Sequence, residues 1–257
     1  MTTASQAQLE SLAPSTRQRL LQVSTATLTT VLFKHGLRNT FLQGPRPVGA
    51  AQRLVGPAYT LRYIPAREDL DPLTVFEDRS HPQRVAVEEC PAGHVLVIDS
   101  RGDAQAASAG NLLVTRLMKR GCAGVVTDGG FRDSPEIAML DMPAYHVRPS
   151  APTNLIRHHA ADLQLPIACG GVAVYPGDVM VGDGEGLVCI PRGIADAVAQ
   201  QAYDQTLYED WVAERIDAGE GLFGLYPATD PEQRSRFATW KQSQRERYPL
   251  ASEAALA

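Results

Sequence analysis

Hydrophobic residues recur at helical spacing near both ends of the chain. Residues 15–35 carry this pattern, and Ser24-Thr25 divides it into two predicted helices, with Gly36 as the stop. A long amphipathic helix is predicted over residues 194–218. The polar tail is expected to be helical again over residues 232–247. The pattern therefore places helices on both sides of a central region of different character.

The central region carries short apolar runs separated by glycine and proline turns, which is typical of buried strands. The predicted strands cover residues 55–63, 95–99, 124–128, 170–174, 179–181 and 187–190, and a short helix is expected to give way to a further strand within 138–147. A helix over residues 111–120 separates two of these runs, so we expect a parallel pair with a right-handed crossover. The charged, proline-broken segment 65–82 is predicted to be a loop, and His158-His159 is placed in a helix.

Composition adds limits on the class of protein. The chain has 257 residues, 44% hydrophobic and 21% charged, which fits one large α/β domain over residues 1–228 followed by a polar extension over 229–257. The net charge of −5 argues against nucleic acid as a partner. The four cysteines form no C-x-x-C pair, and the three at 122, 169 and 189 are interpreted as small buried hydrophobes, so we expect a cytoplasmic protein without disulfides. No stretch reaches the ~20 apolar residues of a membrane span, and the N-terminus lacks an apolar signal core.

Two turns follow neighbouring strands of the predicted parallel pair. The first is Gly110-Asn111-Leu112-Leu113, where a glycine opens a helix, and the second delivers Arg132-Asp133. Helix-opening amides and an arginine suit a carboxylate, and an aspartate suits a divalent cation. Because ligands gather beyond the carboxyl ends of parallel strands, the two turns are candidates for one site.

Each turn also has an ordinary interpretation. Most helix starts bind nothing, and an exposed arginine–aspartate pair is usually a weak surface ion pair. Asp178, Asp183 and Glu185 stand in glycine turns, which explain them without a metal. No G-x-G-x-x-G follows a strand and no P-loop is present, so a nucleotide cofactor is not indicated.

The two turns and a second block together resemble a known family. Residues 110–113 (GNLL), 120–121 (RG), 124–129 (GVVTDG) and Arg132-Asp133, followed by residues 174–191 (VYPGDVMVGDGEGLVCIP), are similar to the motifs of the RraA-like family. That family includes 4-hydroxy-4-methyl-2-oxoglutarate aldolases and a ribonuclease E regulator. The resemblance covers roughly residues 18–218 and implies a swivelling β/β/α sandwich that assembles as a homotrimer or homohexamer.

The resemblance also implies roles for single residues. The backbone of Gly110, Asn111, Leu112 and Leu113 would hold a pyruvyl group, Arg132 would contact its oxygens, and Asp133 would bind Mg²⁺ or Mn²⁺. A neighbouring subunit's acidic residue can help to hold the metal waters, and Glu209 and Glu214 are candidates for it. The second position of the turn is often acidic in the aldolases, whereas here it is Asn111, which can position a water but cannot act as a base.

The leading hypothesis is a class II, metal-dependent lyase. It would cleave a 4-hydroxy-2-oxo acid, or decarboxylate an oxaloacetate-like substrate, through a metal-stabilised pyruvate enolate, with Arg132 and Asp133 as its catalytic residues. Two alternatives stay open at this point. One is a non-catalytic regulator that binds a ribonuclease assembly, and the other is a related sugar-acid lyase whose pocket the segment 65–82 enlarges.

Overall fold

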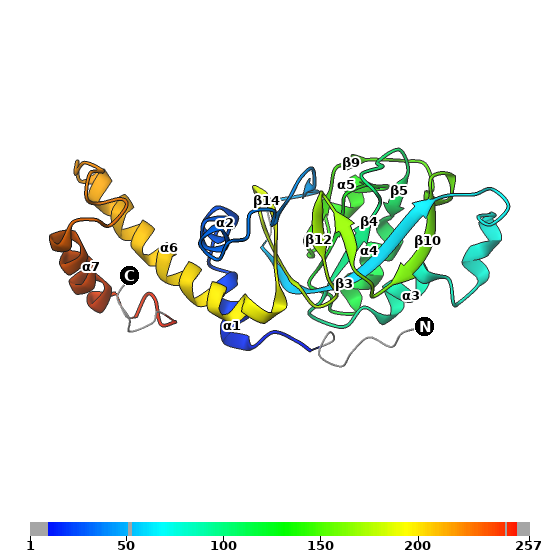
Figure 1. Ribbon diagram of the computed structural model, residues 1–257. Helices are drawn as coiled ribbons and strands as arrows, with labels where there is room; N and C mark the ends of the chain where they lie inside the picture. The colour runs from blue at the N-terminus through cyan, green and yellow to red at the C-terminus, as the bar shows by residue number, and fades with distance from the viewer. Residues whose placement is uncertain (1–9, 51–52, 245, 251–257) are drawn as a thin grey trace.

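The protein is a mixed α/β molecule with a long helix near its C-terminus (Figure 1). A computed structural model describes residues 10–50, 53–244 and 246–250. Its α-helices are α1 (Pro14–Leu20), α2 (Thr25–Lys34), α3 (Pro82–Glu89), α4 (Asn111–Lys119), α5 (Ser134–Ile137), α6 (Ala195–Asp217) and α7 (Pro231–Ser243). Three short 3-10 helices are η2 (Leu73–Glu77), η3 (Asn154–Ile156) and η4 (Arg192–Ile194).

The largest sheet runs in the order β1-β14-β13-β3-β4-β6-β8-β2, with β10 paired to β3 beyond the part of β3 that contacts β13. Its strands are β1 (Phe41–Leu42), β2 (Arg46–Pro47), β3 (Leu54–Pro65), β4 (Val95–Asp99), β6 (Gly124–Thr127), β8 (Ala144–His146), β10 (His158–Leu163), β13 (Val179–Asp183) and β14 (Gly186–Ile190). The steps β3–β4, β4–β6 and β6–β8 are parallel, and the other pairings are antiparallel. The predicted parallel strand–helix–strand unit is therefore present as β4-α4-β6.

Two small sheets lie beside the main one. A parallel sheet joins β5 (Ala107–Ala109), β7 (Gly130–Phe131) and β9 (Arg148–Pro149), and an antiparallel hairpin joins β11 (Ile167–Cys169) to β12 (Val172–Val174). The strands of this parallel sheet, β5, β7 and β9, follow β4, β6 and β8 along the chain. The parallel sheet therefore holds the segments that carry Gly110 and Arg132 next to each other.

Apolar side chains form three buried clusters, and the N-terminal and C-terminal helices share one of them. This cluster contains Leu28 of α2, Val188 of β14 and Trp211 of α6. In Figure 1, α6 leads away from the sheets, α1 and α2 lie along its first part, and α7 packs near its far end. Phe237 of α7 contacts the rings of Tyr208 and Trp211, so the C-terminal segment shares the buried core of α6.

Most predicted elements are confirmed. The predicted division between the two N-terminal helices is present, and Ser24 accepts a hydrogen bond from the amide of Thr27 and caps α2. Gly36 follows α2 with a φ of 82°, a left-handed conformation that favours glycine. Residues 1–9, where the sequence shows no apolar signal core, lie outside the described residues, and the domain boundary at residue 228 stays a prediction.

Three predictions need correction. The strand predicted over residues 170–174 begins only at Val172, because Gly170 and Gly171 have φ values of 56° and 76° and form the turn between β11 and β12. His158-His159 is not helical, because both residues belong to β10 and pair with Pro65 and Ile64 at the end of β3. This pairing joins segments about a hundred residues apart, and a local pattern does not report it. The segment 65–82 is also more regular than predicted, since it contains η2 and ends where α3 begins.

None of the helices among the described residues is long and apolar enough to cross a membrane.

Candidate functional site

The two predicted turns meet at the carboxyl ends of β4 and β6. These strands pair in parallel, with Ile98 opposite Thr127, so their following loops leave the sheet on the same side. β5 then leads into Gly110 and β7 leads into Arg132, and the amide of Arg132 donates to the carbonyl of Ala109 at 3.1 Å. Two parallel pairings in succession thus bring together residues that are about twenty positions apart.

Gly110 is in direct contact with Arg132 and Asp133. A Cβ added to Gly110 would lie 2.7 Å from Cγ of Arg132 and 3.1 Å from Oδ2 of Asp133. The φ of Gly110 is −130°, an ordinary value, so glycine is required here for space and not for backbone conformation. The close approach packs the stem of Arg132 over the helix start.

Arg132 and Asp133 form an ion pair that stays open to solvent. Nε of Arg132 lies 3.6 Å from Oδ2 of Asp133, and their side chains are 47% and 42% exposed. Asp133 has a φ of 56°, in the left-handed region that an aspartate adopts more readily than most residues. This backbone conformation lets α5 begin with only two residues between it and the end of β7, and it turns the carboxylate back toward α4.

The helix-opening amides are only partly available for a ligand. The amide of Asn111 donates to Oδ2 of Asp133 at 3.3 Å, and the amide of Leu113 donates to the carbonyl of Gly110 at 3.1 Å. Within the described part of the chain, the amide of Leu112 has no hydrogen-bond partner. An incoming carboxylate would therefore find one free amide beside the Arg132 guanidinium, together with the positive end of the α4 dipole.

The Asn111 side chain accepts a hydrogen bond at Oδ1 from Thr115 Oγ1, at 3.1 Å. Among the described residues, the Nδ2 donor of Asn111 has no hydrogen-bond partner. The residue is thus suited to hold a water or a substrate oxygen by donation, and it has no group that removes a proton.

Three buried hydroxyl groups connect the two halves of the site from behind. Oγ of Ser108 lies 2.7 Å from Oγ of Ser100 and 2.8 Å from Oγ1 of Thr127, which also accepts from the amide of Gly129 at 3.0 Å. All three side chains are fully buried. Ser108 stands two residues before Gly110, and Thr127 stands five residues before Arg132. The hydroxyl cluster therefore determines how the two turns lie relative to each other.

His146 supports the Arg132 turn from β8. Its Nδ1 accepts a hydrogen bond from the amide of Phe131 at 3.3 Å, and its ring tilts against the Phe131 ring. Burial lowers the pKa of His146 to about 4, so the imidazole is neutral at neutral pH. The neutral form is the one that has a ring nitrogen able to accept this bond.

An open cavity of about 550 Å³ lies beside the same strand ends, and its lining includes Asp99, Arg101, Asp128, Val147 and Gly170. Burial raises the pKa of Asp128, with a further contribution from Asp99. Asp128 accepts from the amides of Ser100, Gly102 and Gly170, so its carboxylate ties three loops together. The cavity lining contains none of the predicted site residues. In the sequence, the feature that indicates this cavity is Asp128 followed by two glycines.

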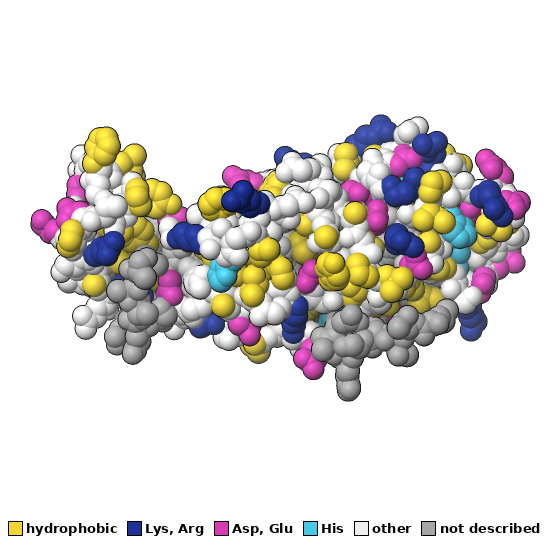
Figure 2. Space-filling model, viewed as in Figure 1, with side chains coloured by type: hydrophobic (Ala, Val, Ile, Leu, Met, Phe, Trp, Pro, Cys, Tyr) yellow, Lys and Arg dark blue, Asp and Glu magenta, His cyan; other side chains and the backbone are white. Residues whose placement is uncertain are grey.

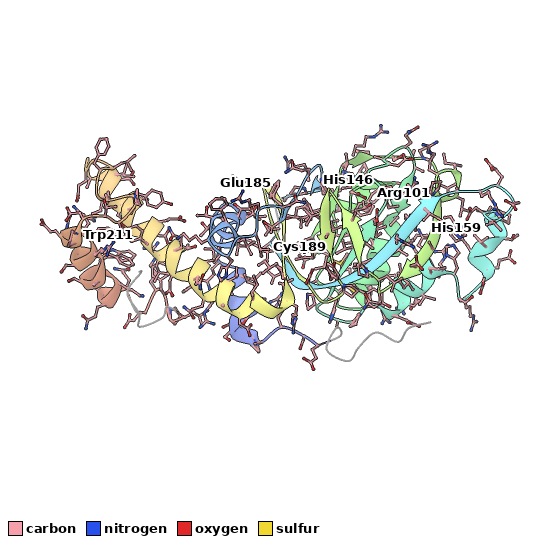
Figure 3. All side chains as sticks on the ribbon, in the orientation of Figure 1. Arg101, His146, His159, Glu185, Cys189 and Trp211 are labelled. Atoms are coloured by element: carbon pink, nitrogen blue, oxygen red, sulfur yellow. The ribbon has the colours of Figure 1, made fainter. Side chains whose placement is uncertain are left out.

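Four of the other carboxylates considered from the sequence have partners inside the chain, those of Glu209, Glu214, Asp178 and Asp183. Glu209 accepts hydrogen bonds from Thr27 and Tyr226, and Glu214 accepts one from the indole of Trp240. The two glutamates predicted to help to hold metal-bound waters are therefore bonded to α2 and to the C-terminal segment. Trp211, on the same helix, lies far along α6 from His146 and Arg101 in Figure 3. Asp178 and Asp183 accept backbone amides of their own or neighbouring turns, as their glycine context predicted.

Asp133 offers a limited set of ligand atoms for a metal. Its Oδ1 has no hydrogen-bond partner among the described residues, and no group of three or more His, Cys, Asp or Glu side chains in that part of the chain could hold a metal ion. One exposed carboxylate suits Mg²⁺ or Mn²⁺, which commonly keep most of their waters when a protein binds them. The donor set therefore fits a largely hydrated divalent cation and does not fit a closed structural metal centre.

Comparison with known proteins decides the family. A family model described as "RraA-like: Aldolase/RraA" matches residues 25–189, which is more than half of the chain. The chain belongs to the RraA-like family. Its swivelling β/β/α sandwich is therefore shown, with the long C-terminal helix α6 that the sequence predicted.

Relatives in the RraA-like family carry different names. A protein of Halalkalibacterium halodurans named "Putative 4-hydroxy-4-methyl-2-oxoglutarate aldolase" is 32% identical over 61% of this chain and 69% of its own length. The protein DlpA of Legionella pneumophila is 26% identical over 81% of this chain, which spans only 33% of that larger protein. The structure of RraAS2 of Streptomyces coelicolor, described as an unusual member of the RNase ES inhibitor RraA family, matches with a TM-score of 0.69 and 30% identity over 79% of this chain and 97% of its own.

Proposed function

We propose that this RraA-like chain is a divalent-metal-dependent lyase that releases pyruvate from a small 2-oxo acid. The observation that carries the proposal is the contact among the Gly110 turn, Arg132 and Asp133. An anion-binding helix start, a planar cation and an exposed carboxylate are the groups that a 2-oxo acid and a divalent cation need together. The aldolase names of several relatives support the same chemistry.

Each site residue would contact a different group of the substrate or the metal. The free amide of Leu112 would donate to the substrate carboxylate, and the Arg132 guanidinium would contact the carboxylate and the 2-oxo oxygen. Negative charge grows on that oxygen when the C–C bond breaks and the enolate of pyruvate forms, so Arg132 would stabilise the transition state more than the bound substrate. A divalent cation held by Asp133 would supply Lewis-acid polarisation of the same oxygens.

Proton handling separates the two reactions that this site could carry out. Aldol cleavage must remove a proton from the 4-hydroxyl group, whereas decarboxylation of oxaloacetate releases CO₂ and needs no such base. Asn111 stands where a carboxylate could assist that step, and it can only donate to a water or a hydroxyl. We therefore expect oxaloacetate-type decarboxylation to be faster than aldol cleavage in this chain.

The test measures pyruvate release from oxaloacetate and from 4-hydroxy-2-oxo acids, with Mg²⁺ or Mn²⁺ and with EDTA. We expect metal-dependent release that is lost in Asp133→Ala and strongly reduced in Arg132→Lys. The matched control is Asp141→Asn, because Asp141 is an exposed aspartate on the loop after α5. Wild-type activity that is indifferent to both EDTA and Asp133→Ala would contradict the metal role. A panel of sugar-derived 2-oxo acids tests for a sugar-acid lyase in the same assay.

We also infer that the chain associates with itself. Leu112 at the start of α4 and Met139 after α5 are 82% and 86% exposed, and both flank the site. Apolar side chains this exposed are typical of a surface that another chain covers. Light scattering after size exclusion is expected to show a homotrimer or homohexamer, and Leu112→Glu is expected to shift it toward monomer.

The similarity to RraAS2 favours one second candidate function, the binding of a ribonuclease assembly. A fold does not determine function by itself, and a regulator can retain the Arg132-Asp133 pair. A pull-down with an RNA-degrading complex, run beside the enzyme assay, separates the two proposals.

A further inference from the structure

Two cysteines meet at the end of α4 that is opposite to the Gly110 turn. Cys90 is the residue directly after α3, and Cys122 follows α4 by three residues. The Cys122 thiol donates to the carbonyl oxygen of Cys90 with Sγ 3.5 Å away, and Sγ of Cys90 lies 4.0 Å from the carbonyl oxygen of the next residue, Pro91. The two cysteines are therefore neighbours although the residues are 32 positions apart.

The surroundings give the two thiols different chemistry. Interaction with the Cys90 side chain lowers the pKa of Cys122, and the nearby Arg120 guanidinium lowers it further, against the effect of burial. The same interaction and burial raise the pKa of Cys90. Nη1 of Arg120 lies 3.9 Å from Oε2 of Glu88, whereas its Nε is buried and has no hydrogen-bond partner in the described structure, so the guanidinium is only partly neutralised beside Cys122. Cys122 is thus the member of the pair that ionises first.

Access favours the same residue. Cys122 is 7% exposed and Cys90 is completely buried, so a small reagent from solvent reaches Cys122 first. The remaining cysteines lack this environment. Cys169 lies near Asp128 and Asp99, and Cys189 contacts Asp178, and burial together with these carboxylates raises the pKa of both thiols well above the usual value. They are therefore expected to be inert.

We propose that Cys90 and Cys122 form a redox modification site that closes an intramolecular disulfide when a peroxide reaches it. The Cys122 thiolate attacks one oxygen of hydrogen peroxide, which breaks the O–O bond and, with one proton, gives a sulfenic acid and water. The Cys90 thiol then attacks the Cys122 sulfur, the S–S bond forms, and the hydroxyl leaves as a second water. Two thiols and one peroxide thus give one disulfide and two waters.

The disulfide would tie the end of α3 to the end of α4. An exposed ion pair between Glu88 and Arg116 already connects these helices, with Nη2 of Arg116 2.7 Å from Oε2 of Glu88. α4 begins at the Gly110 turn, and α3 begins where the segment 65–82 ends. Oxidation would therefore restrain two elements that lead to the candidate site, and the reaction itself does not depend on the proposed lyase activity.

The experiment treats the full-length, reduced wild-type chain with hydrogen peroxide and analyses it by intact mass and by peptide mapping without reductant. The expected product is a monomeric chain that has lost two hydrogen atoms, with the Cys90 and Cys122 peptides linked and a reductant restoring them. Cys169→Ser and Cys189→Ser are the matched controls and should give the same product at the same rate. Chains linked to one another, or equal oxidation of all four cysteines, would overturn the proposal.

Variants separate the two roles within the pair. In Cys90→Ser, Cys122 should stop at the sulfenic acid, which dimedone traps, whereas Cys122→Ser should leave Cys90 reduced. Arg120→Gln should slow the first step several-fold at neutral pH and leave the identity of the product unchanged, because it lowers the thiolate fraction of Cys122. Circular dichroism checks that each variant is folded. Trapping at Cys90 rather than at Cys122, or unchanged kinetics in Arg120→Gln, would contradict these assignments.

Discussion

Gly110 allows close packing that any other residue would obstruct. The contact of its Cα with Arg132 and Asp133 leaves no room for a methyl group, yet its backbone conformation suits every residue type. Removing this space should therefore affect the geometry of the site much more than the stability of the fold. A glycine that is needed only for space in a site should affect activity when it is replaced, whereas a glycine that is needed for a left-handed turn should affect folding stability.

Gly110→Ala tests this distinction. The added Cβ should displace Arg132, and we expect pyruvate release to fall by about 10- to 100-fold, since small misplacements of a positioned group have effects of this size. The midpoint of urea unfolding should change little. Gly193→Ala is the control, because a Cβ at Gly193 meets nothing within 4 Å. Equal activity in the two variants would show that the close packing is not part of the site.

Asn111→Asp tests the proton step. A carboxylate at this position could accept the 4-hydroxyl proton through a water, and general bases typically contribute ~10²–10⁴-fold. We expect aldol cleavage to increase by about tenfold or more while oxaloacetate decarboxylation stays within about twofold. The readout is the ratio of the two rates with the same metal. An unchanged ratio would mean that Asn111 does not limit proton removal.

The lowered pKa of His146 predicts a loss of folding stability in mild acid. Its pKa is about 4 in the folded chain and about 6.5 when unfolded, so the unfolded state binds more protons between these values. Its contribution to the unfolding free energy is complete above pH 6.5 and is lost as the pH falls to 4, on the order of 3 kcal/mol. Urea unfolding between pH 4 and 7 measures the slope, and His146→Gln should make it shallower. Parallel slopes in the two proteins would rule out this role for His146.

The strand ends β4, β5 and β6 determine how the site is assembled. Ser100, Ser108 and Thr127 stand on or directly beside these three strands, and their hydroxyl groups meet where the strands diverge into loops. A hydroxyl cluster with fixed partners orients the loops more specifically than apolar packing, because each hydrogen bond has a preferred direction. The hydroxyl cluster is thus a support for the Gly110 and Arg132 turns.

Thr127→Val removes one hydroxyl group at nearly constant volume. It leaves the amide of Gly129 without its partner and the hydroxyl of Ser108 with only Ser100, so we expect a loss of about 1–3 kcal/mol in urea unfolding. Pyruvate release should fall as well, through kcat more than KM, because Arg132 shifts. Thr127→Ser keeps the hydroxyl group and should restore most of both properties. A serine variant as impaired as the valine variant would attribute the effect to packing instead.

The molecule as a whole has two parts of different character along α6. The ends of β4 and β6 carry the candidate site, whereas α6, α7 and the N-terminal helices share an apolar cluster with β13 and β14. Hydrophobic side chains gather where α6 ends in Figure 2, and Leu222, Phe223 and Tyr226 are exposed in that segment. The C-terminal segment therefore packs against α6 away from the candidate site, and it contributes no residue to the Gly110 turn.

Phe237→Ala tests the role of this segment. Phe237 is 4% exposed and packs against Tyr208 and Trp211, so its truncation should cost about 3–5 kcal/mol of local stability. Trp fluorescence should shift to the red, and hydrogen exchange should rise in α6 and α7 but not in β4 or β6. Metal-dependent pyruvate release per folded chain should remain. Loss of protection in the central strands would mean that the two parts unfold together.

The sequence by itself determined the elements whose signal is local. Helical spacing, apolar runs and glycine stops predict α1, α2, α4, α6, β4 and β6, because each depends on neighbours within one or two turns of the chain. The order of these elements also predicts that the Gly110 and Arg132 turns lie at adjacent strand ends, since parallel pairing follows from the β4-α4-β6 connection.

Only the tertiary structure decided what depends on partners far along the chain. β10 is a strand because it pairs with β3, two of the three amides at the Gly110 turn are occupied within the chain, and Cys90 meets Cys122 across 32 positions. The hydroxyl cluster and the neutral state of His146 likewise arise from burial and from contacts between different strands. Such contacts leave no periodic signal in a single sequence, because their free energy comes from residues that only folding brings together.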